Sequence, residues 1–488
     1  MFKESSPEKG LDDASRPSQR TEILNIEKKS MKEHLIEESI LFISILKWVA
    51  IATGIGIIVG LSTTFFLKIL EWALAYSTGY PYYFLMLPVG LAVSALTTQY
   101  LEPDAKGYGI EKVIEAVHRR GGRIKAAIVP VKLLTAILTI ATGGSAGQVG
   151  PCGQIGASLA SVAAELFRLD ERDRKKIVVC GLSAGFATVL GAPFAGAIFG
   201  VEVLYVGGIV YEILLPSIIA GITGYHIALL FGIHYQFYPF DFAPALTEAF
   251  ILKIVFSGIF FGICSLLVIE ILKKGNAFSQ KFGTFLPLRG LIGGAFLIGM
   301  TLIFSKQFLG TGLETIQTAL RGEEIIFYAF LVKAIFTSIT LNFGGSGGLV
   351  MPILCIGATA GNLFGDLFGL DRATFAAVGF VSLLAGTTNT PIASSILAVE
   401  FFGSAISPYA AIACIVSFLM TGHRSVFPTQ VLSFQKSTSV HVAIGTELEQ
   451  IRTSPQLRDK SLTGVLLRIL KKIKGGIRKR PHSGEPDP

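Results

Sequence analysis

The chain has 488 residues, of which 51% are hydrophobic and 16% charged, and its mean hydropathy is +0.61. This composition is too apolar for a soluble globular protein of this length and predicts an integral membrane protein. The net charge of +8 does not indicate nucleic-acid binding, because the excess Lys and Arg lie beside apolar runs and in the tails. Anionic membrane lipid explains such clusters more simply.

The predicted elements begin with a polar, mixed-charge tail at residues 1–36, expected to be disordered because it lacks the apolar core of a signal peptide. Six apolar runs are long enough, or nearly so, to cross a membrane as helices: 40–67, 83–100, 213–231, 251–272, 291–304 and 325–341. Shorter runs, mostly rich in small residues, predict tilted or partly crossing helices: 126–142, 150–167, 177–190, 351–367 and 375–387. The sequence therefore predicts an all-α, polytopic membrane protein.

The basic residues predict the orientation of these helices. By the positive-inside rule both termini are cytoplasmic, which suits a multi-pass protein of the inner (plasma) membrane. The basic tail at residues 441–488 contains apolar residues at helical spacing over 461–479. This stretch is either an amphipathic helix on the inner leaflet or a solvated tail.

The chain repeats itself within its apolar part. Residues 144–151 read Gly-Ser-Ala-Gly-Gln-Val-Gly-Pro, and residues 345–352 read Gly-Ser-Gly-Gly-Leu-Val-Met-Pro. Matching residues follow both motifs in the same order: Gly156 and Gly357, Asp170 and Asp371, Pro193 and Pro391, Glu202 and Glu400. Duplicated apolar segments broken by Gly and Pro are typical of transporters whose substrate site lies between the repeats near the membrane midplane. The repeat therefore predicts a transport protein.

Each glycine-rich loop leads into an apolar helical run, from Gly150 and from Met351. Backbone N–H groups freed at membrane depth must line a polar cavity or bind a ligand, and helix N-termini suit anions. No Lys or Arg lies in the loops, so an anion bound there can leave quickly, as conduction requires. Close helix packing would explain one such run, but two runs in register favour an anion site.

Glu202 and Glu400 have apolar flanks and two possible roles. Their symmetric placement favours a structural role, such as accepting hydrogen bonds from loop N–H groups, and proton transfer is the alternative. The five cysteines lie in apolar segments without metal-ligand spacing, so neither a metal site nor disulfides are expected. Because no serine elbow, Cys/His cluster or Walker loop is present, we expect neither an enzyme nor a cofactor.

These residues resemble the CLC family of chloride channels and chloride/proton antiporters over roughly residues 41–432. Five stretches carry the resemblance. Residues 147–151 are similar to the family's Gly-(Lys/Arg)-Glu-Gly-Pro, 347–352 to Gly-x-Phe-x-Pro, and 107–110 to the start of Gly-Ser-Gly-Ile-Pro. Residues 191–196, which read Gly-Ala-Pro-Phe-Ala-Gly, are a further close match, and 423–428 are similar to the segment with the inner pore tyrosine. The resemblance implies two inverted repeats with tilted and broken helices, roughly 37–235 and 250–435 within a membrane domain at 37–440. It also implies a homodimer with one anion pathway per subunit.

The resemblance assigns six residues to the anion site: Tyr108, Gly109, Ile110, Leu349, Val350 and Phe427. Backbone N–H groups of Leu349 and Val350 would hold the anion, and Tyr108 would donate its hydroxyl where the family often has serine. Phe427 stands where the family has tyrosine and has no hydroxyl to donate. Six further residues form the pore motifs: Gly147, Gln148, Gly150, Pro151, Gly348 and Pro352.

Two carboxylates of the family are missing. Its gating glutamate aligns with Val149, and the internal proton glutamate of many antiporters aligns with Val203. Proton coupling then lacks an evident carrier, which favours passive conduction of chloride and other small anions. The alternatives are a chloride/proton antiporter with a rewired route, for instance through Glu202, and a non-transporting membrane scaffold, which would gain nothing from the loops. The tail at 441–488 is too short for paired nucleotide-sensing CBS domains, so none are expected.

Overall fold

The computed structural model describes residues 19–235, 237, 247–437 and 442–451. The stretch at 461–479 lies outside these residues. The first helix, α1 (Gln19–Thr78), begins well before the first apolar run. The expectation of a disordered tail is therefore wrong for residues 19–36, because this stretch has neither Gly nor Pro and is rich in strong helix formers such as Glu, Lys, Leu and Met.

The chain forms two units, residues 1–51 and 52–488, and the sites below lie in the second. Its helices follow α1 in chain order: α2 (Leu87–Tyr100), α3 (Ile110–Arg119), α4 (Ile128–Ala141), α5 (Val149–Leu166), α6 (Glu171–Leu190), α7 (Pro193–Glu202), α8 (Tyr211–Leu230), α9 (Glu248–Gln280), α10 (Leu286–Ile303), α11 (Leu313–Leu320), α12 (Ala329–Asn342), α13 (Val350–Leu367), α14 (Arg372–Thr388), α15 (Pro391–Phe402) and α16 (Ser407–Met420). Short 3-10 turns lie at Tyr83–Met86, Pro103–Ala105, Lys306–Phe308, Ser404–Ile406 and Leu448–Gln450. The predicted all-α class is confirmed.

Six of the described helices are long and apolar enough to cross a membrane: Ile36–Thr78, Tyr83–Tyr100, Tyr211–Leu230, Glu248–Gln280, Leu286–Ile303 and Val350–Leu367. Five coincide with predicted long runs. The sixth predicted run, 325–341, is instead the 14-residue helix α12. The first residues of this run are not helical, and Ile325 and Tyr328 among them pack on the core between α2, α10 and α12. The sixth long helix is α13, which the sequence predicts as a short run.

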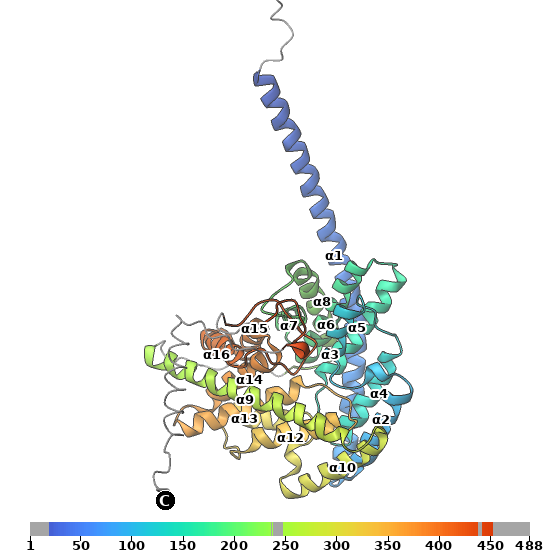
Figure 1. Cartoon of the computed structure of the whole chain (residues 1–488), viewed down its shortest axis with the longest axis vertical. Coiled ribbons are helices and arrows are strands. Elements are labelled where there is room, and N and C mark those ends of the chain that lie inside the picture. The colour runs from blue at the N-terminus through green and yellow to red at the C-terminus, as the bar shows by residue number, and fades with distance from the viewer. Residues whose placement is uncertain (1–18, 236, 238–246, 438–441, 452–488) are drawn as a thin grey trace, which may run out of the picture. The chain divides into compact units, whose positions relative to one another are not determined.

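The helices recur in two sets, with α3 to α8 matched in order by α11 to α16. In the first set α5 packs along α6, and in the second α13 packs along α14 (Figure 1). A Cβ atom added at Gly156 would lie 2.3 Å from the Gly181 carbonyl oxygen, and one at Gly357 would lie 2.4 Å from the Gly379 carbonyl oxygen. Close helix packing therefore explains these two repeated glycines.

The repeated aspartates begin corresponding helices. The Asp170 carboxylate accepts a hydrogen bond from the Asp173 N–H (2.7 Å) at the start of α6, and Asp371 accepts one from the Thr374 N–H (2.8 Å) at the start of α14. Both are N-caps, which satisfy donors that the first helical turn leaves free. The sequence repeat thus marks equivalent helix boundaries.

The segment after α16 returns to the first set of helices. Strand β2 (Val431–Leu432) pairs in parallel with β1 (Tyr205–Val206), the connection between α7 and α8. Arg119, at the end of α3, forms a bidentate ion pair with Glu447. These contacts fix the segment around Phe427 to the first set of helices.

Candidate functional site

The two glycine-rich loops meet and pair with each other. Gly147 N–H donates to the Gly348 carbonyl (2.8 Å), and Gly348 N–H donates to the Gly147 carbonyl (2.6 Å). A Cβ atom added at Gly348 would lie 2.5 Å from the Gly150 nitrogen, and one at Gly150 would lie 2.7 Å from the Gly348 Cα. Glycine is therefore required at both positions for the loops to approach this closely.

A threonine from each repeat also holds the loop of the other repeat. Ser145 N–H donates to Thr340 Oγ1 (3.0 Å), and Ser346 N–H donates to Thr139 Oγ1 (3.0 Å). All four residues are buried. These two hydrogen bonds and the two between the glycines join each loop to the other repeat and make the loops a single structural element.

Both loops end at helix N-termini, at the start of α5 and of α13. The N–H groups of Val149 and Gly150 at α5, and of Leu349, Val350 and Met351 at α13, have no hydrogen-bond partner within the described residues. These residues are buried. Since buried N–H groups are nearly always paired, and helix N-termini favour negative charge, this cluster suits an anion as its ligand.

A third loop lies against the start of α5. Gly109 is the residue before α3, with φ +80°, and a Cβ atom there would lie 2.4 Å from the Gly150 carbonyl oxygen. The neighbouring Tyr108 is half-buried, and its hydroxyl donates to Asn342 Oδ1 (3.3 Å) at the end of α12. The structure therefore brings Tyr108, Gly109 and Ile110 to the paired loops, with the Tyr108 hydroxyl directed at Asn342.

Two buried lysines occupy equivalent positions in the repeats. The Lys132 ammonium donates to the carbonyls of Ala105 (3.0 Å) and Gly107 (2.7 Å), and Lys333 donates to those of Phe308 (3.0 Å) and Gly310 (2.8 Å). Neither has a carboxylate partner among the described residues. Lys132 thus places a positive charge beside the Tyr108 loop. Sequence reasoning missed it, although Lys132 and Lys333 are spaced as Pro151 and Pro352 are.

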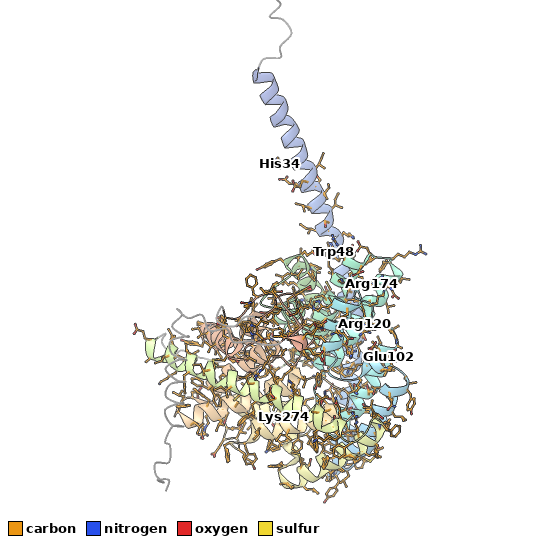
Figure 2. The ribbon with its side chains drawn as sticks, viewed as in Figure 1. His34, Trp48, Glu102, Arg120, Arg174 and Lys274 are labelled. Atoms are coloured by element: carbon orange, nitrogen blue, oxygen red, sulfur yellow. The ribbon has the colours of Figure 1, made fainter. Side chains whose placement is uncertain are left out.

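Other charged side chains gather around α3. Lys125 Nζ donates to Glu102 Oε1 (3.1 Å), and Arg120 Nη1 lies 2.6 Å from Asp104 Oδ2. Figure 2 shows Glu102 and Arg120 along one flank of the helical unit in this view. These ion pairs therefore belong to the surroundings of α3, and none involves a residue of the paired loops.

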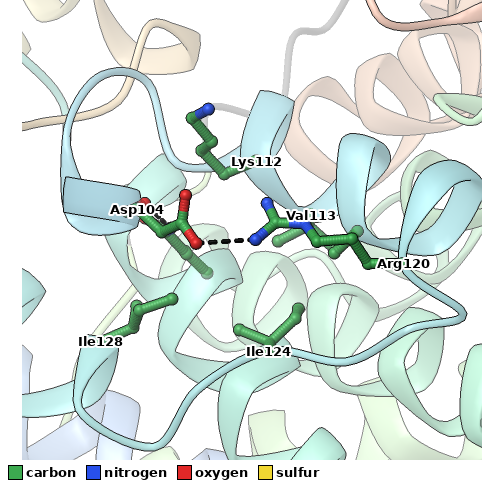
Figure 3. Close-up of a pocket in the computed structure, with 8 residues that line it drawn as sticks. Asp104, Lys112, Val113, Arg120, Ile124 and Ile128 are labelled. Atoms are coloured by element: carbon green, nitrogen blue, oxygen red, sulfur yellow. Dashed lines mark hydrogen bonds and ion pairs between the residues drawn. The ribbon is translucent and has the colours of Figure 1, made fainter. Parts of the chain in front are cut away.

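A small cavity lies between α3 and α5 (Figure 3). Its lining includes the Asp104–Arg120 ion pair, Lys112 and Gln154. Arg120 Nε and Gln154 Oε1 have no hydrogen-bond partner in the part of the chain that the structure describes. A donor and an acceptor facing one small space suit a water molecule.

The family described as "Voltage gated chloride channel" matches residues 89–422. The chain belongs to this family, the CLC family. It is 32% identical over 401 residues to a chloride/fluoride channel protein of Pseudomonas syringae pv. tomato, covering 80% of this chain and 88% of the relative. The crystal structure of a CLC-type fluoride/proton antiporter is similar with a TM-score of 0.75 and 27% identity, over 80% of this chain and 98% of that one.

A slow cyanobacterial Cl⁻/H⁺ antiporter shares the CLC fold at 20% identity, with a TM-score of 0.67 over 77% of this chain and 94% of that one. Together the matches confirm the predicted family and its fold. The chain is a multi-pass membrane protein of a family that transports anions.

Val149 and Val203, which the sequence resemblance aligns with carboxylates of the family, are both buried. Val149 is the first residue of α5, beside the paired glycines. Val203 follows α7, and its carbonyl accepts a hydrogen bond from Gln430 Nε2 (2.8 Å), which also donates to the Thr388 carbonyl (2.8 Å). The side-chain amide of Gln430 therefore lies beside Val203.

Glu202 and Glu400 cap helices of the opposite repeat. Each carboxylate accepts two backbone N–H groups: Glu202 from Ile392 (3.0 Å) and Ala393 (2.8 Å) in α15, and Glu400 from Phe194 (2.9 Å) and Ala195 (2.8 Å) in α7. These contacts satisfy helix donors, and each accepted hydrogen bond favours the charged form of its carboxylate. Accepting backbone N–H groups is the structural role that the sequence favours for Glu202 and Glu400.

Phe427 lies in the segment between α16 and β2. It is fully buried, and its N–H donates to Ser425 Oγ (3.0 Å). Thr429 Oγ1 donates to the Glu111 carbonyl (3.4 Å) in the first turn of α3. The backbone N–H of Phe427 is thus already paired, so an anion beside this residue would contact the aromatic ring of Phe427.

Proposed function

We propose that the chain is a passive channel for chloride and other small anions. The observation that carries the proposal is the set of unpartnered N–H groups where α5 and α13 begin, next to a valine at the gate position. Backbone donors bind an anion without trapping it. Val149 cannot compete with the anion as a charged carboxylate would.

Four residues support passive conduction over proton coupling. Val149 and Val203 cannot carry a proton, and the carboxylates of Glu202 and Glu400 are each engaged by two backbone N–H groups. Tyr108, Leu349, Val350 and the Phe427 ring are the residues that we propose to contact the anion. Lys132 would add the attraction of a buried positive charge.

A second candidate is an anion/proton antiporter with a different proton route. It is favoured by the similarity to a CLC-type fluoride/proton antiporter at 27% identity. Fluoride is a candidate substrate beside chloride, since the relative that is 32% identical is a chloride/fluoride channel protein.

We further propose a homodimer with one pathway per subunit in the plasma membrane, with both termini cytoplasmic. The family resemblance supports the dimer, and the clusters of Lys and Arg support the orientation. The domain at 37–440 and its repeats at 37–235 and 250–435 are part of this proposal.

Efflux from proteoliposomes tests the proposed function. Vesicles loaded with chloride are diluted into low-chloride buffer, and chloride and pH are recorded together with and without a potassium ionophore. A passive channel releases chloride only with the ionophore and moves no protons. Proton uptake locked to chloride release would establish the antiporter, and the absence of flux would favour a scaffold.

A further inference from the structure

The side-chain amide of Asn342 accepts a hydrogen bond from the Tyr108 hydroxyl, and other hydrogen bonds fix the orientation of this amide. Its Nδ2 donates to the Leu272 carbonyl (3.1 Å) of α9 and to Ser338 Oγ (3.2 Å), one turn earlier in α12. Both donors of the amide are therefore used, so its oxygen faces Tyr108 as the acceptor. The orientation of the Asn342 amide follows from this hydrogen-bond network.

The packing of α9 against α12 is built around this amide. A Cβ atom added at Gly275 of α9 would lie 3.0 Å from Asn342 Nδ2 and 2.0 Å from Ser338 Oγ. Ser338 Oγ in turn donates to the Ile271 carbonyl (3.1 Å). Glycine at 275 thus leaves the room that the two polar side chains occupy.

The Tyr108 hydroxyl has one proton, and the backbone of the same residue lies against the start of α5, at the proposed anion site. A Cβ atom added at Gly150 would lie 2.4 Å from the Tyr108 carbonyl oxygen, so the Tyr108 backbone touches the start of α5. The proton can be donated to Asn342 or to an anion, but not to both. At 3.3 Å, the bond to Asn342 is longer than usual for a hydroxyl donor, so an anion can compete for the proton.

We infer that Asn342 is a positioning residue that sets anion selectivity by competing with the permeating anion for the Tyr108 hydroxyl. The inference rests on the proposed function. A strong hydrogen-bond acceptor such as chloride receives the hydrogen bond of the Tyr108 hydroxyl only if the bond to Asn342 breaks, which costs free energy. A weak acceptor such as nitrate leaves the bond to Asn342 intact. Removing the Asn342 oxygen removes that cost, which benefits chloride more than nitrate.

A double-mutant cycle tests this inference by measuring chloride and nitrate efflux from proteoliposomes. We expect Asn342→Leu to raise the chloride-to-nitrate rate ratio by roughly threefold, which is the scale of one net hydrogen bond. In the Tyr108→Phe background the same substitution should leave the ratio unchanged. Ser338→Ala is the control, because it removes a neighbour of Asn342 and keeps the acceptor for Tyr108.

The outcomes separate the inference from the proposed function. Equal shifts in the wild-type and Tyr108→Phe backgrounds, or no shift in either, would overturn the role of Asn342 while flux persists. A wild-type chain without flux would overturn the proposed function and this inference with it. Should Asn342→Leu fail to fold, Asn342→Ser replaces it, since serine is too short to reach the Tyr108 hydroxyl.

Discussion

Gly147 and Gly348 exchange two backbone hydrogen bonds, although 201 positions separate them. Each lies in the loop before a helix that starts with free N–H groups, α5 for Gly147 and α13 for Gly348. The pairing therefore fixes the position of one helix N-terminus relative to the other. The proposed anion site depends on this geometry.

Replacing Gly348 with Ala should separate the loops. The new methyl group would lie 2.5 Å from the Gly150 nitrogen, and overpacking of this kind costs roughly 1–3 kcal/mol. We expect a lower unfolding temperature in detergent and a loss of anion flux. Gly299→Ala in α10 is the matched control, because a Cβ atom there meets nothing within 4 Å. Normal flux through Gly348→Ala would refute the paired-loop geometry.

Replacing Val149 with Glu should create an acid-activated pathway. A charged carboxylate at the start of α5 would occupy the N–H groups that we propose to bind the anion, and its protonation would release them. Flux should be slow at neutral pH and rise as the pH falls. Val149→Gln, which has similar size but cannot charge, should show no such rise. A Glu variant with a normal rate at every pH would show that Val149 is not at the gate.

Replacing Glu202 or Glu400 with Gln should lower stability without altering proton movement. Each carboxylate accepts two backbone N–H groups, and an amide can accept through one oxygen only. The loss should be roughly 1–3 kcal/mol for either variant, measured as unfolding in detergent. A stable Glu202→Gln protein that moves protons differently from the wild type would favour the proton route instead.

Replacing Lys132 with Met should weaken anion binding. Lys132 Nζ donates to the carbonyl of Gly107, the residue before Tyr108, so the substitution removes a positive charge near the proposed anion site and lowers the attraction for chloride. The concentration dependence of chloride flux measures this change. Lys125→Met removes the same charge from a side chain that is 67% exposed and should have little effect. Equal effects of both variants would mean that only net charge matters.

The sequence predicts much of this architecture because its repeat marks local boundaries. Asp170 and Asp371 begin α6 and α14, and the glycine-rich loops end where α5 and α13 begin. Caps, prolines and glycines act within a few residues of their own position, so their spacing is visible in the chain. The helix starts in both repeats follow from such signals.

The partners across the repeats are not predictable from local signals. Thr139 and Thr340 accept hydrogen bonds from loops about 200 positions away, and Asn342 accepts one from the Tyr108 hydroxyl, 234 positions earlier in the chain. A threonine or asparagine in an apolar helix has many possible partners. Only the folded chain determines which one lies within hydrogen-bond distance. The direction of the Tyr108 side chain is for this reason a finding of the structure.

The central claim is that anions cross without protons, and the reversal potential of the current through the purified protein in a planar bilayer tests it most directly. An anion gradient is held constant while a pH gradient is imposed across the bilayer. A passive channel predicts a reversal potential that stays at the equilibrium potential of the anion. A reversal potential that shifts with the pH gradient would contradict passive conduction and establish coupled exchange.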